Sequence, residues 1–186
     1  MNIPYFSLYT SERIYIVNRY MVFTLFLSVF KIRVFFLMNE IQSLYQQVIL
    51  DHNKNPRNYG PLLSANHSAD GMNPLCGDDI TVHLLIENNT IKEISFEGSG
   101  CAIAKSSASI MTTVLKGKTI EQAEQLFNDF HFVVTAPMEA DLHEESLGKM
   151  AVFTGIREFP ARVKCASLAW HTMQSALHGK HIATTE

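Results

Sequence analysis

Cysteine is scarce in this chain of 186 residues, which contains only Cys76, Cys101 and Cys165. An odd number of widely spaced cysteines argues against a disulfide framework. No CxxC pair occurs, so the spacing is weak evidence for a metal site as well. On spacing alone, three unrelated thiols that pack as small hydrophobic side chains are as good an interpretation as a shared metal ion.

Clusters of positive charge and long apolar runs are also missing. The net charge is −3, and lysine and arginine occur singly, which argues against a nucleic-acid partner. Residues 119–148 have seven acidic side chains and no lysine or arginine, which predicts a solvated acidic surface. Residues 22–30 and 34–38 are apolar, but neither run approaches the ~20 residues of a membrane helix. Joining them would place Lys31 and Arg33 inside the bilayer, which is unfavourable.

The segment before Met38 matches no pattern of a folded element. A signal peptide is not favoured, because no small-x-small cleavage site follows the apolar stretch. Met38 directly precedes an amphipathic helix pattern and looks like a true start. We therefore expect residues 1–37 to be an N-terminal extension, which a misassigned start codon or disorder would explain. Residues 38–186 are expected to form one domain without a membrane segment, and a hydrophobic anchor at residues 1–37 is the alternative.

Periodicity in the rest of the chain predicts strands that are followed by helices. Apolar residues at helical spacing cover residues 41–49, and alternation over residues 80–86 predicts a strand. Asn88 and Asn89 supply a turn to a return strand at residues 91–96, and residues 65–72 are a candidate third strand.

Helical patterns begin after Cys101, and Thr119 is placed to cap a second helix. Pro137 interrupts the pattern before a further helical stretch that reaches Ile156, and Pro160 suits the first turn of a last helix. Strands gathered before helices predict an α+β domain, in which a small antiparallel β-sheet is covered by helices.

The residues around Cys76 strengthen the case for a shared site. Cys76 and Asp78 are two residues apart, so their side chains point the same way in an extended segment and can meet one ion. Gly77 between them keeps the backbone permissive. A carboxylate beside thiolates makes a more exchangeable zinc site than one built of cysteine and histidine alone.

The other two cysteines lie in contexts that favour the thiolate. Cys101 follows a Gly-Ser-Gly segment and opens a helix, whose dipole stabilises negative charge at that end. Cys165 is expected in the first turn of the last helix, with Lys164 and Arg162 nearby.

Three segments, NPLCGDDITV, FEGSGCAIAKSSASIM and FPARVKCASLAW, resemble in this order the motifs of the U-type iron–sulfur cluster assembly proteins, the IscU/NifU-like family. The resemblance covers residues 38 to about 178. The IscU branch has a histidine directly before its third cysteine and a shorter gap between its second and third cysteines. Lys164 and the longer gap from Cys101 to Cys165 therefore resemble the SUF-type branch, SufU. The implied fold is the IscU/SufE-like α+β fold.

The resemblance implies a zinc site made by Cys76, Asp78, Cys101 and Cys165, with Cys76 as the catalytic acceptor of persulfide sulfur. The implied partners, in the cytoplasm, are a SufS-like pyridoxal-phosphate cysteine desulfurase and downstream SUF assembly proteins. The alternative is a scaffold that builds a transient [2Fe–2S] cluster on the same residues. Lys164 favours the zinc interpretation, and only under that interpretation is the chain an enzyme, a sulfurtransferase.

Other interpretations explain fewer of these residues. A cysteine-nucleophile hydrolase would leave two cysteines unexplained, and the HxE and PCxxC motifs of zinc-dependent nucleobase deaminases are absent. A purely structural zinc module stays open. Histidine ligands are not expected, because His178 and His181 lie near a C-terminal end that we expect to fray. Arg57 is a candidate either for a partner contact or for an ordinary solvated turn residue.

Overall fold

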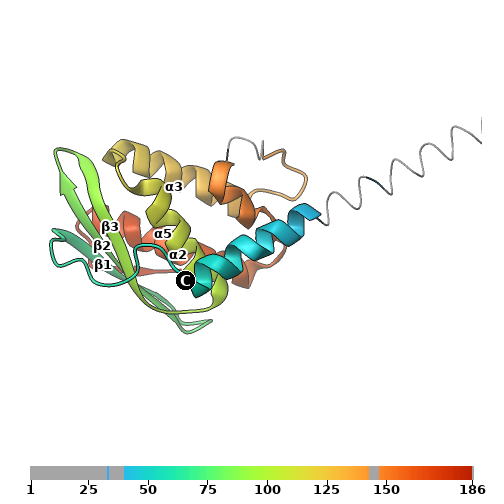
Figure 1. Cartoon of the computed structure of the whole chain (residues 1–186), viewed down its shortest axis with the longest axis horizontal. Helices are drawn as coiled ribbons and strands as arrows, with labels where there is room; N and C mark the ends of the chain where they lie inside the picture. The colour runs from blue at the N-terminus through green and yellow to red at the C-terminus, as the bar shows by residue number, and fades with distance from the viewer. Residues whose placement is uncertain (1–32, 34–39, 143–146, 186) are drawn as a thin grey trace, which may run out of the picture. The chain divides into compact units, whose positions relative to one another are not determined.

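The computed structural model describes Arg33, residues 40–142 and residues 147–185 (Figure 1). The chain divides into two units, Met1–Leu44 and Tyr45–Glu186. The predicted N-terminal extension, residues 1–37, lies outside the described residues except for Arg33. A helix covers residues 40–54, which confirms the helix predicted from residue 41. The elements described below all belong to the second unit.

Four strands form one sheet in the order β3-β2-β1-β4. They are β1 (His67–Asn73), β2 (Asp78–Glu87), β3 (Thr90–Ser99) and β4 (Ile182–Thr184). β1, β2 and β3 are antiparallel neighbours (Figure 1), which confirms the three predicted strands. β4 pairs parallel with β1 and was not predicted.

The position of β4 contradicts the expectation that the C-terminal end frays around His178 and His181. The amide of Asp70 donates to the carbonyl of His181 at 2.8 Å, and Ala183 of β4 is only 7% exposed. A three-residue strand has no alternation that a sequence pattern could reveal. Its pairing with β1 is a contact between distant parts of the chain, which local propensity does not encode.

The β2–β3 hairpin forms as the alternation predicts. Ile80, Val82 and Leu84 of β2 are each at most 1% exposed, so one face of the strand is buried. Asn88 and Asn89 adopt φ angles of 49° and 60°. These left-handed conformations are those of a type I′ turn, whose twist matches that of the flanking strands.

The described chain continues with α2 (Ala102–Leu115), α3 (Ile120–Thr135), the 3-10 segment η1 (Gly148–Glu158) and α5 (Pro160–Leu177). Thr119 caps α3 in a capping box with Gln122, and Pro160 lies in the first turn of α5. Both positions were predicted. The helical stretch predicted to reach Ile156 is a 3-10 segment, and residues 143–146 before it lie outside the described part.

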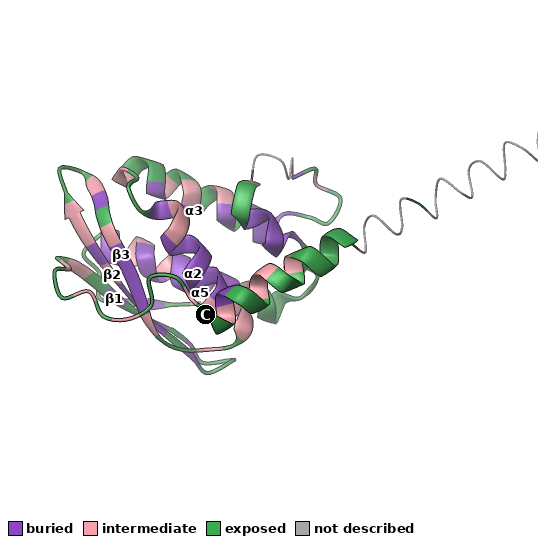
Figure 2. Cartoon of the chain, in the orientation of Figure 1, coloured by how far each residue is buried: buried purple, intermediate pink, exposed green. Residues whose placement is uncertain are grey.

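The core lies between the sheet and the helices, where buried faces meet (Figure 2). α5 packs against β1 and β2, α2 packs against β3 and α5, and α3 packs against α5. Phe130 of α3 stacks on Trp170 of α5 with ring centroids 4.4 Å apart. In the described part of the chain, no helix has both the length and the apolar character that a membrane crossing requires.

Candidate metal centre

The turn between β1 and β2 carries Cys76. The carbonyl of Asn73 accepts the amides of Cys76 and Gly77 at 3.2 and 2.9 Å, which closes the turn. Gly77 has a φ of 70°, with open space where a Cβ would lie, so the turn uses a conformation that glycine adopts readily. Cys76 is exposed on this turn.

Asp78 is the first residue of β2 and is only 2% exposed. Its Oδ1 accepts the backbone N–H of Cys101 at 2.8 Å, and its Oδ2 accepts the side-chain amide of Asn73 at 3.4 Å. Gly100 permits this approach, because a Cβ there would lie 3.1 Å from Asp78 Oδ1. The hydrogen bonds hold the carboxylate against the start of α2 and reduce the cost of its burial.

Cys101 is the N-cap of α2, as its sequence context predicts. Its Sγ accepts the N–H of Ala104 at 3.4 Å and lies 4.0 Å from Asp78 Oδ2. The sulfur therefore lies at the N-terminal end of α2, where the backbone N–H groups point toward it. Like Cys76, Cys101 is exposed.

Cys165 is 3% exposed and lies in the second turn of α5, whereas the sequence placed it in the first turn. Burial raises the pKa of its thiol, and the neighbouring Asp78 and Cys76 raise it further. Arg162, which was expected to favour the thiolate, lies over the Phe159 ring, 4.2 Å from its centroid. Because thiolate formation here is unfavourable without a nearby positive charge, a metal ion would be the natural compensation.

Three of the four predicted ligands come together. The ligand atoms of Cys76, Asp78 and Cys165 lie within 4.8 Å of one another, and the described residues contain one such group. The Sγ atoms of Cys165 and Cys76 are 3.1 Å apart, well beyond the ~2.05 Å of a disulfide. Cys101 lies outside this group, although it is adjacent to Asp78. Two sulfurs and a carboxylate oxygen are a donor set that fits zinc or an iron–sulfur cluster.

Asn73 also contributes to the site, although its sequence context did not predict this. It is 1% exposed, and its Nδ2 donates to Asp78 Oδ2 at 3.4 Å and to Cys165 Sγ at 3.5 Å. The available signal was an asparagine directly before Pro-Leu-Cys, which is equally typical of an ordinary turn.

The other candidates have partners away from this site. The histidine contacts include His52 Nδ1 with Ser109 Oγ at 2.7 Å, His83 Nε2 with Glu97 Oε1 at 3.0 Å, and His171 with Phe127 at 5.2 Å between ring centroids. Arg57 forms an ion pair with Asp51 at 2.6 Å and donates to the carbonyl of Asn55. The side chain of Arg57 therefore has partners that are close in sequence.

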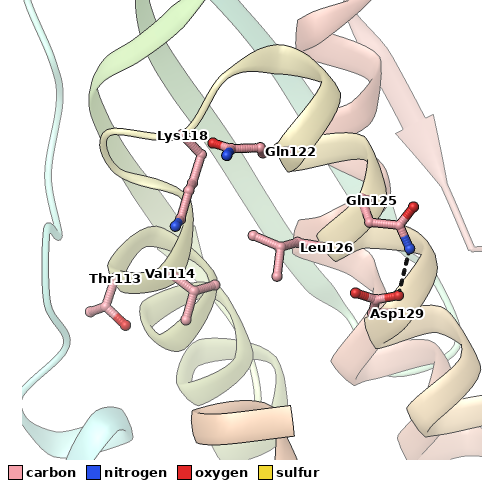
Figure 3. A pocket seen from close by; sticks show the side chains of 7 residues that line it. All are labelled: Thr113, Val114, Lys118, Gln122, Gln125, Leu126 and Asp129. Atoms are coloured by element: carbon pink, nitrogen blue, oxygen red, sulfur yellow. Dashed lines mark hydrogen bonds between the residues drawn. The ribbon is translucent and has the colours of Figure 1, made fainter. Parts of the chain in front are cut away.

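A surface pocket of about 530 Å³ opens between α2 and α3 (Figure 3). It is lined by Thr113, Val114, Lys118, Gln122, Gln125, Leu126 and Asp129, and the Gln125 amide donates to Asp129 at 2.8 Å. The pocket adjoins the C-terminal end of α2, whereas Cys101 caps the N-terminal end, ~20 Å away at 1.5 Å per residue. It therefore adds no group to the thiol site.

Known proteins are similar to this chain in both sequence and fold. The sequence model for the NifU-like N-terminal domain matches residues 44–166. The zinc-dependent sulfurtransferase SufU of Bacillus subtilis (strain 168) is 38% identical over 142 residues, which cover 74% of this chain and 91% of that protein. The iron–sulfur cluster assembly scaffold protein IscU of Streptococcus pyogenes serotype M1 is 32% identical over 140 residues, with coverages of 75% and 86%.

A crystal structure gives the same result for the fold. FiSufU of Fervidobacterium islandicum AW-1, a proposed iron–sulfur cluster assembly scaffold protein for the SUF system, superimposes with a TM-score of 0.64 at 31% identity. The match covers 70% of this chain and 93% of FiSufU. The sequence match, the relatives and the α+β fold agree with the resemblance found in the cysteine motifs, and the chain belongs to the family of NifU-like N-terminal domains.

Proposed function

We propose that this protein is an iron–sulfur cluster assembly protein that accepts persulfide sulfur from a pyridoxal-phosphate cysteine desulfurase. The observation that carries the proposal is the convergence of Cys76, Asp78 and Cys165 within 4.8 Å. SufU of Bacillus subtilis supports the acceptor role by name, because it is a zinc-dependent sulfurtransferase. FiSufU, which is described as an assembly scaffold protein for the SUF system, supports a role in cluster assembly.

In this proposal, Cys76, Asp78, Cys101 and Cys165 hold one zinc ion. Bound zinc keeps thiols deprotonated near neutral pH and shields the thiolates from unwanted reactions. Asp78 and Cys165 are the fixed ligands, because each is at most 3% exposed and each accepts the amide of Asn73.

Cys76 is the proposed acceptor because it is the least restrained of the four. It is exposed and precedes Gly77, around which there is open space. Within the described part of the chain, N–H groups donate to the sulfurs of Cys101 and Cys165, whereas the hydrogen-bond partner of the Cys76 sulfur is the Cys165 thiol. Cys76 can therefore turn toward a partner with few interactions lost.

The transfer step needs no external oxidant or reductant. The Cys76 thiolate attacks the outer sulfur of the desulfurase persulfide, and a new S–S bond forms as the persulfide S–S bond breaks. The desulfurase cysteine leaves as a thiolate with the electron pair of the broken bond. The transferred sulfur keeps its proton, so Cys76 ends as a persulfide.

The partners follow from this chemistry. We place the protein with a SufS-like desulfurase, which supplies the sulfur, and with downstream SUF assembly proteins, which receive it. Three free thiols suit the reducing cytoplasm. Leu75, directly before the acceptor, is 64% exposed and is the side chain that we expect to contact the desulfurase first.

Residues 38–186 are proposed to be the functional domain. A chain that begins at Met38 keeps every described element, and of the described residues it lacks only Arg33. We expect this shorter chain to bind zinc and to accept sulfur as well as the full chain does. A loss of zinc binding in the shorter chain would assign residues 1–37 a structural role.

A scaffold for a [2Fe–2S] cluster is the second candidate function. The relative from Streptococcus pyogenes is named as an IscU scaffold, and the same cysteines together with Asp78 are suitable cluster ligands. Lys164 stands directly before Cys165. The IscU branch has a histidine at this position, and the difference favours a zinc site over a [2Fe–2S] cluster.

The test of the proposed function is a measurement of zinc, iron and acid-labile sulfide per chain, on protein expressed from Met38 and purified without oxygen. We expect one zinc per chain without labile sulfide, and a protein that stimulates cysteine desulfurase turnover. Iron with matching labile sulfide would support the scaffold instead. A chain without any metal would contradict the four-ligand site.

Asp78→Ala should weaken zinc binding by about 10-fold or more, because it removes a ligand and leaves the N–H of Cys101 without its acceptor. Sulfur acceptance should fall in proportion, measured as desulfurase turnover with the variant present. Asp79→Ala is the matched control, since Asp79 is the adjacent aspartate and is exposed. Desulfurase turnover that is unchanged with Asp78→Ala would overturn the ligand role of Asp78.

A further inference from the structure

We propose that Asn73 is a positioning residue that keeps Asp78 and Cys165 on the metal, so that Cys76 is the ligand that leaves. The inference rests on the proposed function for the metal itself. It concerns the side chain of Asn73, which belongs to neither the predicted ligands nor the predicted acceptor.

The side-chain amide of Asn73 joins two ligands that come from different elements. Asn73 ends β1 and pairs with Asp78 of β2 in the sheet register. Its Nδ2 donates to Asp78 Oδ2 at 3.4 Å and to Cys165 Sγ of α5 at 3.5 Å. Since Asn73 is 1% exposed, water has little access to replace these hydrogen bonds.

The backbone of Asn73 acts on a third ligand. Its carbonyl accepts the amides of Cys76 and Gly77 and closes the turn that carries Cys76. One residue therefore contacts three of the four proposed ligands, but in two ways. The side chain restrains Asp78 and Cys165, whereas the backbone restrains the turn and leaves the Cys76 sulfur unrestrained.

The negative charge of the ligands means that an N–H donor at this position stabilises the site. Three thiolates and a carboxylate carry more negative charge than one zinc ion neutralises, and N–H donors stabilise such buried anions. Cys101 receives the N–H of Ala104, but in the described structure the N–H donor of Cys165 is Asn73. Without this amide, Cys165 would lose its donor and Asp78 would keep only the N–H of Cys101.

The consequence is a fixed order of ligand release. With the amide in place, Cys76 would be the ligand free to leave a bound metal, while Asp78 and Cys165 would hold it in the protein during sulfur transfer. Without the amide, Asp78 and Cys165 would hold a bound metal less firmly, and zinc would be lost more readily. Asn73 thereby separates release of the acceptor from loss of the metal.

Two variants of Asn73 test the side chain and leave the backbone carbonyl in place. Asn73→Ala removes the amide, and Asn73→Asp keeps its shape but removes both N–H donors. The matched control is Asn66→Ala, directly before the first residue of β1 and ~23 Å away at ~3.3 Å per residue. Asn66 bonds the backbone of Ile86 at 2.8 and 2.9 Å, so its loss affects the sheet and not the site.

The measurement is the rate at which the zinc-loaded proteins transfer zinc to a chromogenic chelator, together with the absorption spectrum of the cobalt(II)-substituted forms and the melting temperature. We expect both Asn73 variants to release zinc about 10-fold faster or more, with a changed cobalt spectrum. Asn66→Ala should lower the melting temperature but release zinc at the rate of the unmodified protein.

The outcomes separate this inference from the proposed function. Equal release rates for the Asn73 variants and the unmodified protein, or equal acceleration by Asn66→Ala, would overturn the role of Asn73. A protein that binds zinc and shows the expected release rates but does not accept sulfur would overturn the proposed function and leave the role of Asn73 supported. A protein that binds no zinc would overturn both.

Discussion

Cys76→Ser is expected to lower sulfur acceptance by about 100-fold or more. The thiolate is the nucleophile in persulfide exchange, and a serine hydroxyl remains protonated near neutral pH. Cys76 is exposed on its turn, whereas Cys165 is 3% exposed, so Cys165 is poorly placed to replace it. Acceptance is measured as desulfurase stimulation, and the sulfur is located by mass spectrometry of peptides after one turnover.

Comparison with Cys101→Ser distinguishes the role of Cys76 as a nucleophile from its role as a metal ligand. Both substitutions remove an exposed cysteine and one proposed ligand, so both should weaken zinc binding. In the Cys101→Ser protein loaded with excess zinc, added sulfur should still appear on Cys76. Persulfide on Cys101 or Cys165 in the Cys76→Ser protein would show that another cysteine is the acceptor.

Gly98→Ala is expected to destabilise the domain by about 3 kcal/mol. Gly98 has a φ of 119°, which side chains rarely allow, and a Cβ there would overlap the backbone carbonyl oxygen of Asp79. Relief requires the end of β3 to move away from β2. Because Cys101 follows three residues later and donates its N–H to Asp78, the variant should also bind zinc more weakly.

Two other glycines provide graded controls for this substitution. Gly117 has a φ of 81° but open space around it, so Gly117→Ala should cost about 1 kcal/mol from backbone strain alone. Gly155 has neither a positive φ nor a close neighbour, and Gly155→Ala should change stability by about 0.5 kcal/mol or less. Urea unfolding gives the three values. Equal stability of the Gly98→Ala and Gly155→Ala proteins would contradict the overlap.

The sequence predicts those parts of the fold whose cause is local. Alternation over β2, the asparagine turn at Asn88 and Asn89, and the capping box of Thr119 each depend on neighbouring residues, and the structure confirms them. β4 was missed because its position depends on pairing with β1, more than 100 residues earlier. The segment η1 was predicted as helix because an apolar helical spacing does not distinguish α from 3-10 geometry.

The candidate site was predictable to a similar extent. The cysteine contexts and the family resemblance named four residues, of which the structure brings Cys76, Asp78 and Cys165 together. Cys101 lies outside this group although it touches Asp78, and no sequence pattern gives such a distance. Asn73 was missed because its contact with Cys165 joins residues 92 positions apart, which exists only after α5 packs on the sheet.

The origin of the three converging ligands has a consequence for biosynthesis. Cys76 and Asp78 come from the first hairpin of the domain, and Cys165 comes from α5, the last long helix described. In small zinc fingers, closely spaced ligands let the metal drive folding. Here Cys165 joins Cys76 and Asp78 only through contacts of high sequence separation, which form slowly. Metal would therefore load onto a nearly complete polypeptide, because a chain without a packed α5 would lack Cys165 at the site.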